Sequence, residues 1–222
     1  LPEDQKHAEL FLSETIRYFE FYKPILGPYP WPKFDIVENF FTTGYGMPTY
    51  TLLGKKVLPV MVMMAARNNG QIPGGYIAHE LVHCWWGNWV YPDYESGNWC
   101  EGLTSWYSNY LMKDATDPEK AFEHRKRIST TFSIRVGEKN DYPLRQFRGK
   151  TEEFENDIGY GKSCMLFHML ALRVGYEPYF ETMRGIIRDF GGKRATWGDF
   201  EAAFSKTAGE DLSWFFDQWL DR

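Results

Sequence analysis

The sequence is poor in cysteine and has no long apolar run. Its 222 residues include only Cys84, Cys100 and Cys164, an odd and low number that excludes a disulfide framework and favours buried free thiols. The longest apolar stretch, 57–66, contains Pro59 and falls well short of the roughly 18 residues of a membrane span. The first residues contain neither the basic n-region nor the apolar h-region of a signal peptide, so no secretory signal is predicted in this chain.

The chain also lacks an excess of positive charge. It carries 25 lysines and arginines against 30 acidic residues, which gives a formal net charge of −5 at pH 7. This balance argues against nucleic acid or an anionic membrane as a partner bound through bulk electrostatics. The basic run 124–127 is too short to change that conclusion, and we expect His124 within it to lie at the surface.

Aromatic residues, by contrast, are abundant. They make up 18% of the chain, which is 43% hydrophobic and 25% charged. This length and composition are typical of one globular domain, or of two small ones, with a core built from large side chains. The chain is too apolar and too weakly charged to be disordered.

The first third of the sequence predicts one helix followed by short strands. Apolar residues at helical spacing favour a helix over 4–22, and the Pro- and Gly-rich stretch 23–32 is expected to end it. Short strands are predicted over 34–41 and 50–53, with a Gly-rich loop between them. The stretch 57–66 fits a strand or a helix equally well.

From residue 75 onward the pattern is helical. The predicted helices cover 76–88, 101–114, 118–136, 160–174, 177–190, 197–206 and 211–219. Two stretches, 89–100 and 138–158, have no strong period and are expected to be loops. A few strands followed by many helices give an α+β layout that is mainly helical, with a small N-terminal sheet and a C-terminal helical lobe.

A candidate metal site opens this helical part. Residues 79–83 read His-Glu-Leu-Val-His, and positions i and i+4 of a helix lie on one face about one turn apart. His79 and His83 can therefore bind the same ion, and zinc suits imidazole ligands in a site with one open position. Glu80 lies about 100° around the helix axis from His79, where it can reach a water on the metal without being a ligand itself.

A tetrahedral zinc ion that binds two imidazoles and one water needs one more ligand from the protein. The acidic candidates that follow are Asp93, Glu95 and Glu101. Asp93 and Glu95 fall in a predicted loop, whereas Glu101 begins a predicted helix, which holds a carboxylate more firmly. We therefore predict one zinc ion per chain, bound by His79, His83 and Glu101.

Four stretches of the chain match a known family. These are 79–88, which contains the metal motif, 99–103 around Glu101, and the stretches 160–170 and 212–220. Together they resemble the gluzincin zinc metallopeptidases of the aminopeptidase N and leukotriene hydrolase family. The resemblance implies a thermolysin-like catalytic domain and, in a longer protein, further domains flanking it.

The resemblance also implies roles for individual residues. It implies that the three side chains already predicted are the zinc ligands. It further implies that Glu80 is the general base and that the hydroxyl of Tyr160 stabilises the oxyanion. Residues 1–222 would form one catalytic domain, in which 1–74 hold a helix, the small sheet and the substrate-edge loop. The helical lobe with the metal site would then occupy 75–222, and the partner would be a peptide substrate.

Two features depart from the family pattern. His83 and Glu101 are separated by one residue fewer than is usual in the family, a difference that a surface loop absorbs easily. Pro48 stands where the family's aminopeptidases carry the glutamate that binds the free amine of the substrate. Proline has no charge and no side-chain acceptor, so strict aminopeptidase activity is not expected. Glu38 is the nearest acid, but it falls in a predicted strand.

The predicted function is zinc-dependent hydrolysis of peptide bonds by a metal-bound water. Two alternatives are compatible with the same residues: hydrolysis of a non-peptide electrophile, and a non-catalytic zinc-containing module that binds peptides. The remaining histidines do not add to the site. His168 lies in an apolar helix and is expected in the core, while His7 is expected in solvent.

Overall fold

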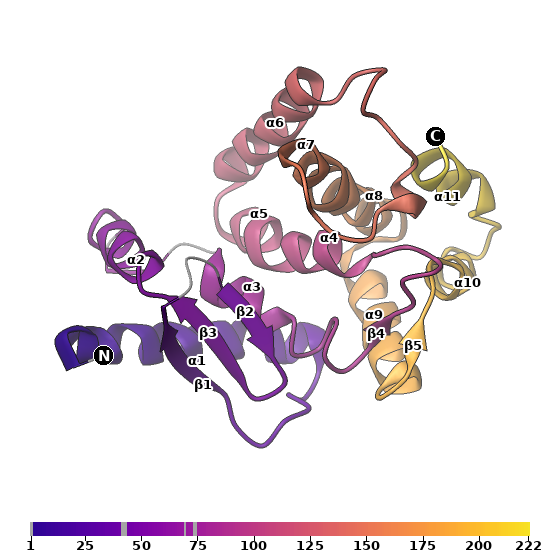
Figure 1. Ribbon diagram of the computed structural model, residues 1–222. Coiled ribbons are helices and arrows are strands. Elements are labelled where there is room, and N and C mark those ends of the chain that lie inside the picture. Colours follow the sequence, from indigo (N-terminus) through magenta and orange to yellow (C-terminus); the bar gives the residue numbers. More distant parts are fainter. Residues whose placement is uncertain (1, 41–43, 69, 73–74) are drawn as a thin grey trace.

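The computed structural model describes residues 2–40, 44–68, 70–72 and 75–222, and in these it is mainly helical with two small sheets (Figure 1). The N-terminal elements are η1 Pro2–His7, α1 Ala8–Leu26, β1 Asp35–Asn39, β2 Gly44–Met47, β3 Tyr50–Gly54 and α2 Val57–Ala66. No helix in the described part of the chain is long and apolar enough to cross a membrane.

The elements from residue 76 onward are mostly helices, several of them continuous with the next. They are α3 Tyr76–Val82, β4 Tyr91–Pro92, α4 Cys100–Ser105, the π-helical η2 Trp106–Leu111, α5 Met112–Thr116, α6 Pro118–Arg135, η3 Leu144–Gln146, α7 Glu153–Asn156, the π-helical η4 Asp157–Lys162, α8 Ser163–Val174, α9 Tyr176–Phe190, β5 Arg194–Ala195, α10 Trp197–Ala208 and α11 Ser213–Leu220.

The helix α1 is held by one apolar face. Tyr18, Tyr22 and Leu26 on that face are buried, at the spacing that an amphipathic helix needs. The Tyr18 hydroxyl donates a hydrogen bond of 2.8 Å to the carbonyl of Ile72, which fixes the helix against the segment that precedes α3. Burial of the last turn outweighs the donor lost at Pro24, so the helix ends four residues later than predicted.

The three-stranded sheet has the order β1-β3-β2, with β1 parallel and β2 antiparallel to β3. Its edge strand β2 packs on α3 (Figure 1). A Cβ added to Gly46 would lie 2.8 Å from the carbonyl oxygen of Glu80 and 2.9 Å from the Cβ of His83. The backbones approach this closely only because residue 46 has no side chain.

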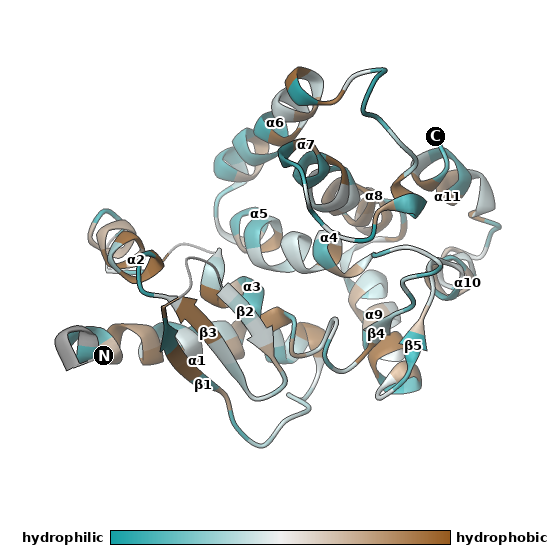
Figure 2. Ribbon diagram, in the orientation of Figure 1, coloured by the Kyte–Doolittle hydropathy of each residue, from teal (hydrophilic) through white to brown (hydrophobic). Residues whose placement is uncertain are grey.

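The core is largely aromatic, as the composition predicts. Trp86 and Trp99 are fully buried and meet edge to face, with ring centroids 6.0 Å apart. The indole nitrogen of Trp99 donates to the carbonyl of Ala195 at 2.8 Å, which ties the start of α4 to β5. In Figure 2 the strands β1 and β3 each contain a brown stretch, whereas α6, which buries only Ala121, is mostly teal.

Several predicted boundaries are wrong. The helix expected over 76–88 ends at Val82, because the following turns bring the Asn88 backbone N–H back to the His83 carbonyl. The Gly-rich stretch expected as a loop contains the strand β2. The stretch 57–66 is helical, and the expected loops hold the short elements β4, η3 and α7.

Other predictions from the sequence are confirmed. The three cysteines are free and buried. His168 is buried, with its Nε2 atom 3.4 Å from the hydroxyl of Tyr110. His124 is only half exposed, because its ring lies 6.1 Å from that of Tyr110, so the prediction of a surface position holds only in part.

Replacing Gly102 should destabilise the protein, because this residue forms the contact between α4 and α8. A Cβ at this position would lie 1.9 Å from the Oγ atom of Ser163, so Gly102→Ala must push the helices apart. We expect a loss of about 1–3 kcal/mol in the free energy of unfolding, measured by denaturant titration. Adding Ser163→Gly should recover part of it.

The matched control is Gly185→Ala within α9. The nearest atom to an added Cβ there is the end of a flexible arginine, 3.6 Å away, so this variant should be neutral or up to about 1 kcal/mol more stable. Equal stability of the Gly102 and Gly185 variants would contradict the packing described for α4.

Candidate metal centre and its cleft

The helix α3 brings the two histidines of the motif together. His79 lies in its last turn and His83 caps its C-terminal end, so both imidazoles project from the same face. Their Nε2 atoms are 3.1 Å apart and their rings are nearly perpendicular. Glu80 lies between them in the sequence and is 7% exposed.

Glu101 reaches the same point from the first turn of α4. Its Oε2 atom lies 3.4 Å from the Nε2 atom of His79 and 3.5 Å from that of His83. The structure therefore brings together all three side chains predicted as ligands, and their donor atoms lie within 4.8 Å of one another.

These distances can be compared with what a zinc ion requires. Zinc binds imidazole nitrogen and carboxylate oxygen at about 2.0–2.2 Å, so ligands at neighbouring corners of a tetrahedron lie roughly 3.4 Å apart. The three separations of 3.1, 3.4 and 3.5 Å are close to that value. The donor set of two nitrogens and one oxygen also fits zinc.

Neighbouring groups fix both imidazoles with Nε2 directed at the centre. The Nδ1 atom of His83 lies 3.0 Å from the carbonyl of Trp86, which can only accept, so the Nδ1 proton is held there. The Nδ1 atom of His79 lies 3.4 Å from the hydroxyl of Ser108, which donates its own proton to the carbonyl of Thr104. Such outer contacts set the tautomer and ring orientation of metal-binding histidines.

The Glu101 carboxyl is strongly biased toward its charged form. Burial alone would raise its pKa, but the hydrogen bonds and charges of the two imidazoles lower the pKa well below the ordinary value for glutamic acid. An ionised carboxylate between two imidazoles is the state that a metal ligand needs.

A cavity of about 320 Å³ opens directly onto this centre. Its walls include Gly44, Gly46, Asn88, Tyr94 and Tyr160, together with the three ligands and Glu80. The ring of Tyr160 stacks on that of His79 with centroids 6.3 Å apart. Burial raises the pKa of the Tyr160 hydroxyl, and the charge of Glu101 raises it further, so the hydroxyl keeps its proton and can donate it to a bound ligand.

A second cavity, of about 390 Å³, continues the cleft on another side. The two cavities share Gly44, His79, Glu80 and Tyr160 among their walls. The residues that line only the second cavity are Gly75, Tyr76, Asn109, Lys150 and Asn156. Tyr94 in the first cavity and Lys150 in the second lie in stretches without period, so no sequence pattern selects them.

The other candidates lie away from the centre. Asp93 accepts a hydrogen bond from the backbone N–H of Glu95, and neither residue belongs to the ligand cluster or lines the cleft. Glu38 lies on β1, and β3 separates this strand from β2, which borders the cleft. Pro48 lies in the turn between β2 and β3, where its carbonyl lies 3.4 Å from the hydroxyl of Tyr29.

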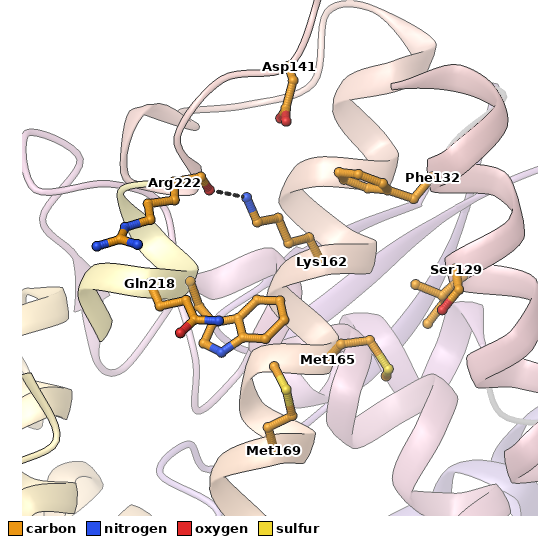
Figure 3. A pocket seen from close by; sticks show the side chains of 10 residues that line it. Ser129, Phe132, Asp141, Lys162, Met165, Met169, Gln218 and Arg222 are labelled. Atoms are coloured by element: carbon orange, nitrogen blue, oxygen red, sulfur yellow. Dashed lines mark hydrogen bonds between the residues drawn. The ribbon is translucent and has the colours of Figure 1, made fainter. Parts of the chain in front are cut away.

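The molecule has a larger cavity, of about 650 Å³, outside this site. It is bounded by α6, η4, α8 and α11 and lined by apolar residues such as Phe132, Met165 and Met169 (Figure 3). Lys162 points into it and donates to the carbonyl of Arg222 at 2.8 Å. Among the described residues of its wall, Asp141 is the one acidic side chain, so this cavity does not form a second ligand cluster.

Two histidines and a carboxylate that could hold a metal ion, with a second carboxylate beside them, form a candidate site of the kind found in metal-dependent hydrolases. Comparison with known proteins identifies the family. Residues 11–219 match the model of the peptidase family M1 domain. The chain therefore belongs to peptidase family M1, whose solved members include zinc metallopeptidases.

Curated relatives of this chain are aminopeptidases. It is 27% identical over 217 residues to Aminopeptidase M1 of Arabidopsis thaliana, covering 93% of the chain and 24% of the relative. It is 25% identical over 232 residues to the alanine/arginine aminopeptidase of Saccharomyces cerevisiae, covering 100% of the chain and 27% of the relative. The chain thus spans about a quarter of the length of these relatives.

Solved structures show the same fold. An M1 zinc metallopeptidase from Deinococcus radiodurans superposes with a TM-score of 0.71 at 18% identity, over 94% of this chain and 44% of that one. A mutant of an M1 zinc metallopeptidase from the same organism, bound to a Tyr-Ser-Ala substrate, gives a TM-score of 0.69 at 17% identity over the same shares. The mainly helical architecture with small sheets is thereby confirmed as that of M1 metallopeptidases.

The predicted ligands can be tested by metal binding alone. The protein should bind one zinc ion per chain, and His79→Ala, His83→Ala or Glu101→Ala should each weaken zinc binding by more than about 100-fold, because removing a ligand costs more than removing an outer contact. Chelator competition gives the affinity, and elemental analysis gives the stoichiometry.

The matched control is His124→Ala, which removes a half-exposed histidine that belongs to α6 and not to the cluster. Its zinc affinity should equal that of the parent. Unchanged affinity in the three ligand variants would show that zinc binds elsewhere.

Proposed function

We propose that this chain hydrolyses peptide bonds with zinc bound by His79, His83 and Glu101. The observation that carries the proposal is the convergence of these three donors at tetrahedral spacing in the wall of a cleft that also contains Glu80 and Tyr160. Membership of peptidase family M1 supports the reaction class. The Deinococcus radiodurans structure with a bound peptide supports peptide as the substrate.

Glu80 is placed to act as the general base. Zinc held at this site would supply Lewis-acid chemistry, making water more acidic and polarising a carbonyl group. Glu80 lines both cavities and is almost fully buried, so its carboxylate faces the space where water and substrate meet. In the proposed reaction it takes a proton from the attacking water and delivers it to the amine that leaves.

Tyr160 is placed to stabilise the negative charge that develops on the substrate. Its ring packs against His79, and its hydroxyl, whose pKa is raised, stays protonated near neutral pH. A hydrogen-bond donor fixed beside a developing oxyanion acts mainly on the transition state, so its contribution appears in kcat.

The proposed activity does not include strict removal of single N-terminal residues. Pro48 takes the place of the family's amine-binding glutamate and lines neither cavity. The carboxylates that line the two cavities are Glu80 and Glu101, which already have roles at the metal. The aminopeptidase activity named for the relatives is therefore not carried over to this chain.

We also propose that residues 1–222 act as one thermolysin-like catalytic domain. Residues 1–74 would supply the edge strand β2 along the cleft, and residues 75–222 would supply the metal ligands. Packing of Gly46 against α3 supports a shared cleft between these two segments. Further domains flanking this one remain a prediction from the family resemblance.

A panel of substrates separates this proposal from its alternatives. Free amino-acid amides, N-blocked peptides and internally quenched peptides are each assayed with and without chelator. Cleavage of blocked or internal bonds only would support the proposal, and cleavage of the amides would support an exopeptidase. Zinc-loaded protein that binds peptides but cleaves none would support a non-catalytic peptide-binding module. If esters or epoxides, assayed in addition, were the only substrates cleaved, the protein would be a hydrolase of another electrophile.

Glu80→Gln should remove catalysis and leave zinc in place. The amide has nearly the shape of the carboxylate but cannot accept the proton, so kcat should fall at least about 100-fold. Elemental analysis should still give one zinc ion per chain. Turnover close to that of the parent would exclude Glu80 as the base.

Tyr160→Phe should lower kcat about 100-fold while changing KM much less, because the lost donor acts on the transition state. The control is Tyr142→Phe, which removes a hydroxyl that contacts Glu155 outside the cleft and should leave both constants unchanged. An unaltered kcat in Tyr160→Phe would assign this residue a structural role only.

A further inference from the structure

The second cavity of the cleft differs from the first in its charge. Its wall contains Lys150, which lies in the loop between η3 and α7. The first cavity has no lysine or arginine among the described residues of its wall. The residues outside the described ranges, at positions 1, 41–43, 69 and 73–74, are Leu, Phe, Thr, Thr, Asn, Pro and Gly, so they add no charged side chain. Lys150 is thus the cleft's one cationic side chain apart from the histidines.

From this arrangement we propose that the second cavity is a subsite for a carboxylate of the substrate, bound by Lys150. The proposal rests on the peptide hydrolysis proposed above and names the class of peptide that the site prefers. The carboxylate would lie within a residue or two of the bond that is cleaved, since the second cavity shares His79, Glu80 and Tyr160 with the metal centre.

The charge balance of the cleft supports an anion and not an ammonium group. The two negative charges of Glu80 and Glu101 would together balance the two positive charges of a zinc ion bound beside them, so neither carboxylate is available to pair with a substrate amine. Lys150 adds a positive charge that the cleft does not neutralise. Its ammonium lies 3.5 Å from the Oε1 atom of Glu153, an exposed side chain that does not line the cavity.

The surroundings of Lys150 also suit a carboxylate. Its side chain is 38% exposed, whereas that of Glu153 is 79% exposed, and an ion pair with so exposed a partner contributes little. A substrate carboxylate can therefore replace Glu153 at small cost. Asn109 and Asn156, in the same wall, carry amide donors for its remaining lone pairs. The volume of about 390 Å³ is within the usual range for ligand pockets.

Paired peptides test the proposal and separate the two sources of a carboxylate. One pair has the same sequence with a free C-terminal carboxylate or a C-terminal amide. A second pair has Glu or Gln next to the cleaved bond, on either side of it. In at least one pair the charged peptide should have a kcat/KM about three- to tenfold higher, mainly through KM, and the preference should shrink as salt is added.

Substitutions at Lys150 should then act on that preference. Lys150→Gln should abolish it, Lys150→Arg should keep it, and Lys150→Glu should reverse it. The matched control is Lys139→Gln, which changes the net charge of the chain equally at an exposed position outside both cavities and should keep the parent's preference. No preference in the parent, or a preference that survives Lys150→Gln, would overturn the proposal.

Binding measurements keep this test independent of catalysis. The same fluorescent peptide pairs are titrated into Glu80→Gln protein, with and without Lys150→Gln, and Kd is read by anisotropy. Tighter binding of the charged peptide that disappears with Lys150→Gln supports the subsite even if the parent cleaves nothing, in which case only the proposed hydrolysis fails. Equal Kd values for both peptides in the Lys150-containing protein would exclude the subsite.

Discussion

The site depends on two close contacts between backbone segments, one of β2 with α3 and one of α4 with α8. The edge strand β2 lies on α3 because Gly46 presents no Cβ toward Glu80 and His83. The helix α4 lies on α8 because Gly102 presents none toward Ser163, where an added Cβ would be 1.9 Å from the hydroxyl oxygen. The first contact positions α3, which carries the histidines, and the second positions α4, which carries the carboxylate, so a small shift of either helix would alter the spacing of the donors.

The electrostatics of the centre follow from that spacing. Glu101 is buried, which by itself favours the protonated acid, yet the neighbouring imidazoles hold its pKa far below the usual range. The outer contacts of the histidines are to the Trp86 carbonyl, the hydroxyls of Ser108 and Thr104 and the thiol of Cys100, whose pKa burial raises. They fix the rings without adding a second negative charge. A zinc ion there would keep about one net positive charge, which favours binding of a polarised carbonyl.

The convergence of the three candidate ligands could be predicted from the sequence because each depends on local geometry. A helix places residues i and i+4 on one face wherever it occurs, so His79 and His83 converge without knowledge of the fold. Glu101 could be preferred over Asp93 and Glu95 because a helix start follows it. The role predicted for Glu80 follows from its position on the helix as well as from the family resemblance, whereas that of Tyr160 comes from the resemblance alone, and the structure brings both side chains to the same cavity.

Other parts of the cleft could not be predicted because tertiary contacts decide them. The glycines of β2 have low strand propensity and read as a loop, yet β2 pairs with β3, and Gly44 and Gly46 lie against α3, where an added Cβ would be 3.0 and 2.8 Å from Glu80 oxygens. Tyr94 and Lys150 lie in stretches with no period, and they reach the cleft through the path of the chain around the helices. In both cases the information is in the packing partner, which lies far away in the sequence.

The turn at Pro48 bears on the proposed choice of substrate. Proline fixes its own φ and removes a backbone donor, and here it lies between the paired residues Met47 and Tyr50. Pro48 lines neither cavity and brings no carboxylate to them, so in the proposed function the interaction of a substrate carboxylate with Lys150 takes the place of an interaction between a substrate amine and an acid.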